Sequence, residues 1–241
     1  KQHLIDRKLA PTTVNRRIAS LRSFVGFAKN LGIIPWSLNV KGLKVTSQRD
    51  LRGPGVPGFS GMVAQAASHK GAKGTRDVAI LRLLFDLGLR RGELTALDLS
   101  DVDIQGKTLQ VIGKGKTQKI ALTLPDRTAK ALAEWIAKRG NAPGALFTSF
   151  DHAKKGSGRL TGHSVYRLIR GLGEKLGIKT RPHGIRHTSI TEALKRAQAH
   201  GYDIEEVLQF SRHSNVAMLL VYRDKERDAQ GSIAELVSGA V

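Results

Sequence analysis

A stretch rich in glycine and proline, residues 36–61, is the feature that most limits how this chain can fold. It holds two prolines and five glycines, and its apolar residues follow no sustained helical or strand spacing. Proline and glycine are the strongest local breakers of regular structure. We therefore predict a small folded part at residues 1–48, a linker at residues 49–57 and a larger part at residues 58–241.

Positive charge is concentrated in the smaller part. The chain has 40 lysines and arginines against 20 acidic residues, a net charge of +20, and residues 1–50 hold ten of the former and two of the latter. A charge of this size on a folded domain indicates a polyanionic partner such as nucleic acid. General surface basicity, as on a ribosomal or heparin-binding protein, is the alternative.

The composition also excludes several classes of protein. There is no cysteine, so disulfides and thiolate metal sites are excluded, and the chain fits a reducing cytoplasm. The sequence has no run of about 18 apolar residues that could span a membrane, and no signal peptide is visible. Because the chain begins at Lys1 and already in mid-pattern, we expect it to be a piece of a longer protein that lacks an N-terminal part.

A basic amphipathic helix is predicted to begin at Pro11 and to end at Gly32. Proline and threonine are good helix starters, and apolar residues at positions 14, 18, 21, 25 and 28 follow spacings of three and four. Arg16, Arg17 and Arg22 lie off that stripe. These arginines could lie against phosphates, or they could form an ordinary solvated face.

The larger part is predicted to be mostly helical. Helices are expected to begin at residues 60, 74, 125 and 161 and to cover about residues 183–198, 203–211, 215–223 and 232–237, with a helical turn at 89–94. Residues 108–112 and 119–124 indicate the two strands of a β-hairpin, with Lys114 and Lys116 at its tip. The expected fold class is mainly α with a small antiparallel β-sheet (α+β).

The segment Arg181–Tyr222 holds an unusual set of polar side chains. They are His183, Arg186, His187, Arg212, His213 and Tyr222. The spacing of His183 and His187 could hold zinc, but position 184 is glycine rather than the glutamate of a zinc-protease motif. Arg186 between them would also repel a cation. The set instead offers hydrogen-bond donors for a phosphate and a hydroxyl that could attack it, and we expect no metal site.

Two motifs in the first half of the larger part are ambiguous when taken alone. Gly115-Lys116-Thr117 could be mistaken for the end of a nucleotide-binding P-loop, but position 110 is glutamine and a strand follows. Lys114 is either solvated or able to reach into a groove and donate a proton. Arg90 alone would more often be structural or exposed, and Glu93 is close enough in sequence to orient it.

Taken together, these motifs resemble those of the tyrosine recombinase (phage integrase) family. The matching pattern is Gly88-Leu89-Arg90-x-x-Glu93-Leu94, then Lys114 on a hairpin, then His183-x-x-Arg186-His187, His213 and Tyr222. Arg90 and Lys114 are 24 residues apart, and His213 and Tyr222 are 9 apart. The resemblance covers about residues 55–235, a catalytic domain. Residues 1–48 look like the second half of the family's helical core-binding domain, which would be truncated here.

This sequence departs from the family pattern at two places. Ser211-Arg212-His213 stands where the family commonly has Leu-Gly-His, and Ile185 stands where it has leucine. The second change is mild. The first adds a charge beside the site, and the sequence alone offers no account of it.

The resemblance implies how a DNA phosphodiester would be held and attacked. Arg90 and Arg186 would hold the non-bridging phosphate oxygens, because a guanidinium presents a planar fork to them. His213 would donate one more hydrogen bond. Tyr222 would be the nucleophile and would form a covalent 3′-phosphotyrosine, leaving a free 5′-hydroxyl. The reaction would need no cofactor, metal or ATP.

The remaining matches would move protons or support their neighbours. His183 would be the base for the tyrosine, and Lys114 the acid that protonates the 5′-oxygen leaving group. Glu93 and His187 would orient the residues around them.

The resemblance also implies the partners of the chain. The substrate would be a double-stranded DNA recombination site, contacted by Arg16, Arg17, Arg22, Lys116 and Arg212. A homotetramer would assemble on this DNA through the apolar C-terminal tail around Ile233, Leu236 and Val237, although the tail could instead pack on its own domain. No membrane partner is expected, and the location would be cytoplasmic and nucleoid-associated.

Other functions stay open beside the recombinase. A type IB topoisomerase has a closely related active site and would relax supercoils as a monomer. A non-catalytic DNA-binding regulator could use the same fold, although the complete residue set argues against a decayed site. A metal-dependent nuclease is the weakest alternative.

Overall fold

The computed structural model describes residues 1–45, 53–113, 115–150, 158–220, 222 and 229–239. The chain divides into two compact units, Lys1–Asp50 and Leu51–Val241. The identity of the first unit as half of a core-binding domain stays a prediction. Every helix within the described ranges is too short or too polar to cross a lipid bilayer.

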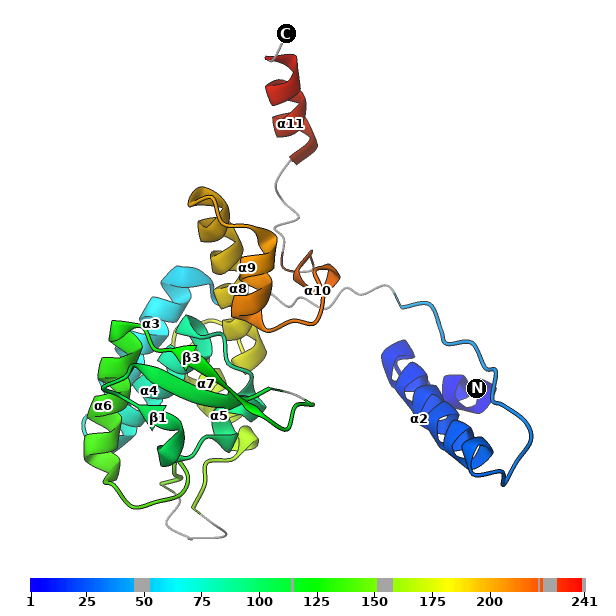
Figure 1. The fold of residues 1–241 in the computed structure, drawn as a ribbon, viewed down its shortest axis with the longest axis horizontal. Helices are drawn as coiled ribbons and strands as arrows, with labels where there is room; N and C mark the ends of the chain where they lie inside the picture. Colours follow the sequence, from blue (N-terminus) through cyan, green and yellow to red (C-terminus); the bar gives the residue numbers. More distant parts are fainter. Residues whose placement is uncertain (46–52, 114, 151–157, 221, 223–228, 240–241) are drawn as a thin grey trace. The chain divides into compact units, whose positions relative to one another are not determined.

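The expected fold class, mainly helical with one small antiparallel sheet, is confirmed (Figure 1). The elements are α1 Gln2–Asp6, α2 Pro11–Asn30, α3 Gly55–Ala67, α4 Ala72–Asp86, α5 Arg91–Ala96, η1 Leu99–Asp101, β1 Val102–Asp103, β2 Thr108–Ile112, β3 Lys119–Thr123, α6 Asp126–Arg139, α7 Gly162–Glu174, α8 Pro182–Ala199, α9 Ile204–Ser211, α10 Ala217–Leu220 and α11 Ala229–Ser238.

The first unit is built on α2, which begins at Pro11 as predicted. Val14 and Ile18 are buried, and the side chain of Asn15 exchanges hydrogen bonds with the backbone of Leu43, at 2.9 and 2.6 Å. The segment after the helix is thereby tied back to it. Beyond Ile18 the predicted apolar stripe is covered only in part, because Val25 and Ala28 are half-buried and Leu21 is 53% exposed. The described part of this unit offers too little chain to cover the whole stripe.

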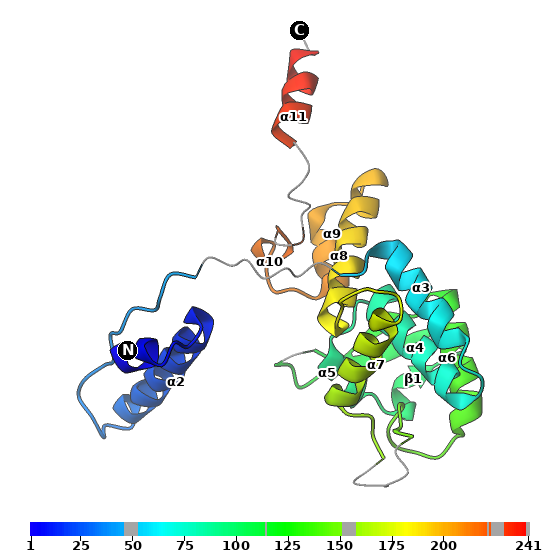
Figure 2. The same ribbon diagram turned by 180° about the vertical axis from the view of Figure 1, so that it is seen from behind.

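The core of the second unit surrounds α4. This helix buries Ile80, Leu81, Leu83 and Leu84 completely and packs against α3, α6 and α8 (Figure 2). Apolar side chains on several faces of one helix lose contact with water only when other helices enclose it. Because α8 packs against α4, the position of α4 determines where α8 lies. The turn that follows α4 starts from the end of the same helix.

The sheet has the order β1-β2-β3 and is antiparallel throughout. In the predicted hairpin, Leu109 pairs with Leu122 and Ile112 pairs with Lys119. Leu109 and Val111 point into the core, in the alternation that a half-buried strand requires. The third strand, β1, was not predicted, because its two residues are too few to display a period of two.

Two predicted boundaries are wrong. α3 begins at Gly55 rather than at residue 60, so it overlaps the predicted linker. Pro57 is tolerated there because the N–H groups of a helix's first turn have no intrahelical partner to lose. α10 spans only Ala217–Leu220 rather than 215–223. Asn215 lies outside it and accepts a hydrogen bond from the N–H of Met218 at 3.1 Å, as a capping residue does.

Candidate active site

Arg90 lies where the chain turns from α4 into α5. Gly88 has φ +53°, in the left-handed region that glycine adopts freely, and Arg90 then precedes α5 in an extended conformation. Glu93, with a side chain only 3% exposed, accepts hydrogen bonds from the Arg90 backbone N–H at 2.9 Å and from Arg90 Nη1 at 2.6 Å. The first bond fixes the Arg90 backbone, and the second directs its side chain.

The charge of Glu93 is maintained by its arginine neighbours. Burial by itself disfavours the carboxylate, but the hydrogen bonds from Arg90 and the positive charges of Arg212 and Arg90 outweigh it. The pKa of Glu93 is therefore lowered from its ordinary value of 4.5. At neutral pH the site holds a buried anion that can bind two guanidinium groups.

Arg186 projects from α8 into the interior and is 2% exposed. Nη1 donates to the Gly88 carbonyl and Nη2 to the Ser211 carbonyl. Burial, followed by the charges of Arg90 and Arg212, lowers its pKa to about 10. Arg186 therefore remains charged at neutral pH, and its placement brings the α4–α5 turn and the end of α9 to one point.

His213 follows α9 directly and faces Arg186, with Nε2 at 3.4 Å from Arg186 Nη2. Burial, followed by the charges of Arg186, Arg90 and Arg212, lowers the pKa of His213 to about 4. The ring is therefore neutral at pH 7, and a neutral imidazole donates from one nitrogen and accepts at the other.

Tyr222 is buried between two histidines, with a residue exposure of 7%. Its ring centroid is 4.7 Å from that of His187 and 5.5 Å from that of His213. Thr191 Oγ1, from the middle of α8, donates to the Tyr222 carbonyl at 3.3 Å. This bond anchors the main chain of Tyr222, and the ring lies beside those of His187 and His213.

His183 lies in the first turn of α8, at the solvent-open rim of the site. Partial burial of its ring, followed by the charges of Arg186, Arg181 and Arg90, lowers its pKa below 6.5. The neutral imidazole is the form that can accept a proton, and this environment favours it at neutral pH.

The predicted residues are thus only partly brought together. Arg90, Glu93, Arg186, His213 and Tyr222 converge, with His183 on the same helix as Arg186. Lys114 lies outside the described residues.

The five residues predicted to contact DNA differ in how exposed their side chains are. Arg16, Arg17 and Arg22 are exposed on α2 in the first unit, and Lys116 is exposed on the hairpin. Arg212 is different, because its side chain is only 10% exposed and it bonds to protein atoms. The DNA-binding role of all five stays a prediction.

Sequence reasoning missed two features that position the site. Thr191 donates a hydrogen bond to the Tyr222 carbonyl. The sequence signal that could have revealed Thr191 is its position one helical turn after His187. A Cβ added at Gly53 would lie 1.9 Å from the Gly184 carbonyl oxygen, and Gly55 N–H donates to Thr188 Oγ1 at 3.3 Å. The chain entering the second unit therefore packs directly on the start of α8, and no local sequence pattern reveals that contact.

Among the described residues, no group of three or more histidine, cysteine, aspartate or glutamate side chains is arranged to hold a metal ion. The prediction that the site uses no metal remains a prediction.

Known proteins resemble this chain along most of its length. The model of the phage integrase family matches residues 63–228. Tyrosine recombinase slr0733 of Synechocystis sp. is 34% identical over 99% of this chain and 76% of its own length. The crystal structure of XerA recombinase superposes with a TM-score of 0.62 at 26% identity, covering 97% of this chain and 78% of that one.

A structure of the Tn1549 transposon integrase in complex with transposon right end DNA has the same fold, with a TM-score of 0.70 at 18% identity, over 100% of this chain and 83% of that one. These matches favour the recombinase over the topoisomerase and the non-catalytic regulator. The chain therefore belongs to the phage integrase family of tyrosine recombinases, and it is a site-specific DNA recombinase that works through a tyrosine-linked intermediate.

Proposed function

We propose that Arg90, Arg186 and His213 hold the scissile phosphate of a duplex recombination site while Tyr222 attacks it. The observation that carries this proposal is the convergence of two charged guanidinium groups, a neutral imidazole and a phenol, contributed by three separate segments of the chain. A phosphodiester repels nucleophiles through its own charge, so cationic donors must neutralise that charge in the transition state.

The two arginines keep donors available for this task. A guanidinium carries five N–H groups. The guanidinium bonds of Arg90 go to Glu93 and to the Arg212 carbonyl, and those of Arg186 go to two carbonyls and His213. Each side chain is therefore fixed by some of its donors, and the others can bind phosphate oxygens without further ordering.

The proposed chemistry exchanges one phosphoester bond for another. The Tyr222 oxygen forms a bond to phosphorus while the bond to the 5′-oxygen breaks. His183 accepts the phenol proton, and Lys114 donates a proton to the leaving oxygen. A 5′-hydroxyl from another strand can then reverse the step and release Tyr222. Because a phosphoester is conserved throughout, the cycle needs no ATP, metal or other cofactor.

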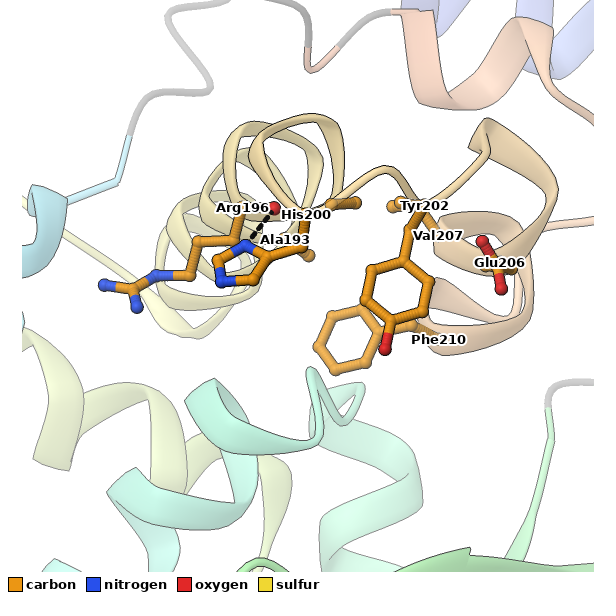
Figure 3. Close-up of a pocket in the computed structure, with 8 residues that line it drawn as sticks. Ala193, Arg196, His200, Tyr202, Glu206, Val207 and Phe210 are labelled. Carbon is orange, nitrogen blue, oxygen red and sulfur yellow. Dashed lines mark hydrogen bonds between the residues drawn. The ribbon is translucent and has the colours of Figure 1, made fainter.

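We further propose a homotetramer on DNA, linked through the tail helix α11. The sequence places Ile233, Leu236 and Val237 at spacings that share one helical face, and Val237 is exposed. The proposed acceptor is a pocket of about 300 Å³ where α8 ends and α9 begins (Figure 3). Its apolar lining includes Ala193, Ala197, Tyr202, Val207 and Phe210.

The tail of a second copy would fill this pocket, because an apolar helical face and an apolar pocket both lose contact with water on docking. Replacing Val237 with aspartate should shift complexes on a full recombination site from tetramers to smaller species in light scattering. Unchanged tetramers would assign the tail to its own domain.

We also propose which residues bind the DNA backbone and where in the cell the enzyme lies. The exposed arginines of α2, together with Lys116, would bind backbone phosphates, and chromosomal DNA would place the enzyme at the nucleoid in the cytoplasm. A basic face of this kind supplies affinity without reading sequence.

The direct test is covalent trapping on a nicked suicide substrate. Wild-type protein should accumulate a covalent complex because the cleaved fragment diffuses away before religation. The Tyr222→Phe variant should bind the same DNA and form no adduct. An adduct with the phenylalanine variant would show that another residue is the nucleophile.

A further inference from the structure

Arg212 occupies the interior of the site rather than its DNA-facing surface. We propose that Arg212 is a positioning residue, which holds Glu93 and the turn after α4 so that Arg90 and Arg186 are aimed at the phosphate. This inference rests on the proposed function of those two arginines. It assigns a task to the side chain at which the sequence departs from the family pattern.

The backbone of Arg212 adopts the left-handed conformation at the end of α9, with φ 55° and ψ 38°. A residue with a Cβ rarely adopts this region, which disfavours L side chains sterically. Arginine at this position therefore carries a backbone cost that glycine would avoid. A side chain retained against that cost should make compensating interactions.

Those interactions are four hydrogen bonds made by one guanidinium. Nη1 donates to the carbonyls of Leu87 and Phe210, at 3.0 and 3.1 Å. Nη2 donates to the Gly88 carbonyl and to Glu93 Oε2, both at 3.1 Å. The guanidinium thus joins the end of α9 to the turn after α4 and to the first turn of α5, which are more than a hundred residues away in sequence.

Arg90 is held by Arg212 from two directions. Glu93 accepts from Arg90 Nη1 through one oxygen and from Arg212 Nη2 through the other. The carbonyl of Arg212 accepts from Arg90 Nη2 at 3.0 Å. The side chain of Arg212 therefore fixes the carboxylate that orients Arg90, and its main chain supplies a second acceptor.

Arg186 is held through the same assembly. The Gly88 carbonyl accepts from both Arg186 Nη1 and Arg212 Nη2. The other acceptor of Arg186 is the carbonyl of Ser211, the residue before Arg212. Without the Arg212 side chain, the two segments that carry these acceptors would lose the bonds that its guanidinium makes to the carbonyls of Leu87 and Gly88.

Lysine cannot reproduce this arrangement. Its single ammonium is a compact point charge, whereas the planar guanidinium reaches four acceptors in different directions at once. Both terminal nitrogens of Arg212 each donate to two protein acceptors, so none of their four N–H groups is left for a phosphate oxygen. The geometry therefore favours a role inside the protein over a phosphate contact.

The test separates DNA cleavage from DNA binding in two variants, Arg212→Lys and Arg212→Gly. Single-turnover formation of the covalent complex is measured at saturating suicide DNA, and affinity is measured across a range of salt concentrations. We expect cleavage to fall by about 100-fold, the size of effect that a small misplacement of catalytic groups produces. Affinity and its salt dependence should stay at the wild-type values.

Two controls calibrate these readouts. Arg127→Lys changes an exposed arginine on α6, far along the chain from the site, and should leave cleavage at the wild-type rate. Lys116→Ala removes an exposed lysine and reports what the loss of a phosphate contact looks like, a salt slope reduced by about 0.9. Thermal unfolding shows whether each variant is folded, and if Arg212→Gly is not, Arg212→Lys decides the question.

A double-mutant cycle with Glu93→Gln shows whether Arg212 acts through Glu93. Residues that act as one unit give non-additive losses. The double variant Glu93→Gln with Arg212→Lys should therefore cleave within about threefold of the slower single variant. Losses that multiply, or Arg212 variants that cleave at the wild-type rate, would overturn the proposal.

Failure of the positioning role can be told from failure of the proposed function. If Tyr222→Phe abolishes the adduct while both Arg212 variants cleave normally, the nucleophile stands and the positioning role fails. If both Arg212 variants bind more weakly with a reduced salt slope and cleave normally at saturation, Arg212 is a DNA contact and the proposal is wrong.

Discussion

The arginines of α2 and the arginines around α8 belong to one basic chain but are placed in opposite ways. Arg16, Arg17 and Arg22 are exposed on the first unit. Arg186 is 2% exposed and Arg212 has a side chain 10% exposed, and both donate to backbone carbonyls. The net charge therefore predicts a polyanionic partner, and burial separates the arginines that could bind it loosely from those that build the site.

The comparison has a physical basis in solvation. An exposed arginine is screened by water and salt, so it adds affinity and little precision. A buried arginine loses its hydration and must be held by fixed acceptors, which leaves its remaining donors pre-oriented. The second arrangement is costly to build, and it suits a transition state better than a ground state.

The largest expected effect follows from Arg186. Arg186→Lys keeps the charge but cannot reach the Gly88 and Ser211 carbonyls together while also binding a phosphate oxygen. Cleavage should fall by about 1000-fold, the upper end for loss of one transition-state donor. Single-turnover trapping on a suicide substrate measures the rate, and a filter-binding assay should find DNA affinity changed much less. Equal losses of rate and affinity would place Arg186 with the surface arginines.

The next effect is a pH dependence that depends on His183. Its lowered pKa keeps the ring neutral at pH 7, so cleavage should be constant near neutrality and fall as pH drops through a value below 6.5. His213 stays neutral until about pH 4 and adds no step above that. The Arg181→Gln variant removes a positive charge beside His183, so the pKa of His183 should rise. The fall in cleavage should therefore move to higher pH. A fall that does not move would argue against His183 as the base.

The smallest effect is expected on α2. Arg17→Ala should weaken DNA binding by a few-fold at physiological salt and reduce the salt slope by about 0.9, because one phosphate contact is lost. Binding titrations at several salt concentrations measure both quantities, on recombination-site DNA and on unrelated DNA. A loss confined to the recombination site would mean that Arg17 reads sequence.

The fold could be predicted wherever periodicity was long enough to be read. α2 and the hairpin of β2 and β3 were found because their apolar spacings extend over several residues. β1 has two residues and no readable period. Leu21 belongs to the predicted apolar stripe and is exposed, because a stripe shows that a face is apolar and not whether anything covers it.

The site could be predicted as a set of residues but not as a geometry. The motifs around Arg90, Arg186 and Tyr222 are local in sequence, and the resemblance supplied their order. Sequence does not tell a buried arginine from an exposed one, so Arg212 was assigned to the DNA surface and found bonded to Leu87, Gly88 and Glu93. Such contacts join segments more than a hundred residues apart, and only the packing around α4 brings them together.

The most direct test of the account is the identity of the tyrosine that becomes linked to DNA. The chain has three tyrosines, and Tyr202 is the accessible choice at 60% exposure, whereas Tyr222 is buried at 7% between two histidines. Mass spectrometry of peptides from the trapped complex should find the DNA adduct on Tyr222 alone. An adduct on Tyr202 or Tyr166 would contradict the claim that the buried arginine cluster is the active site.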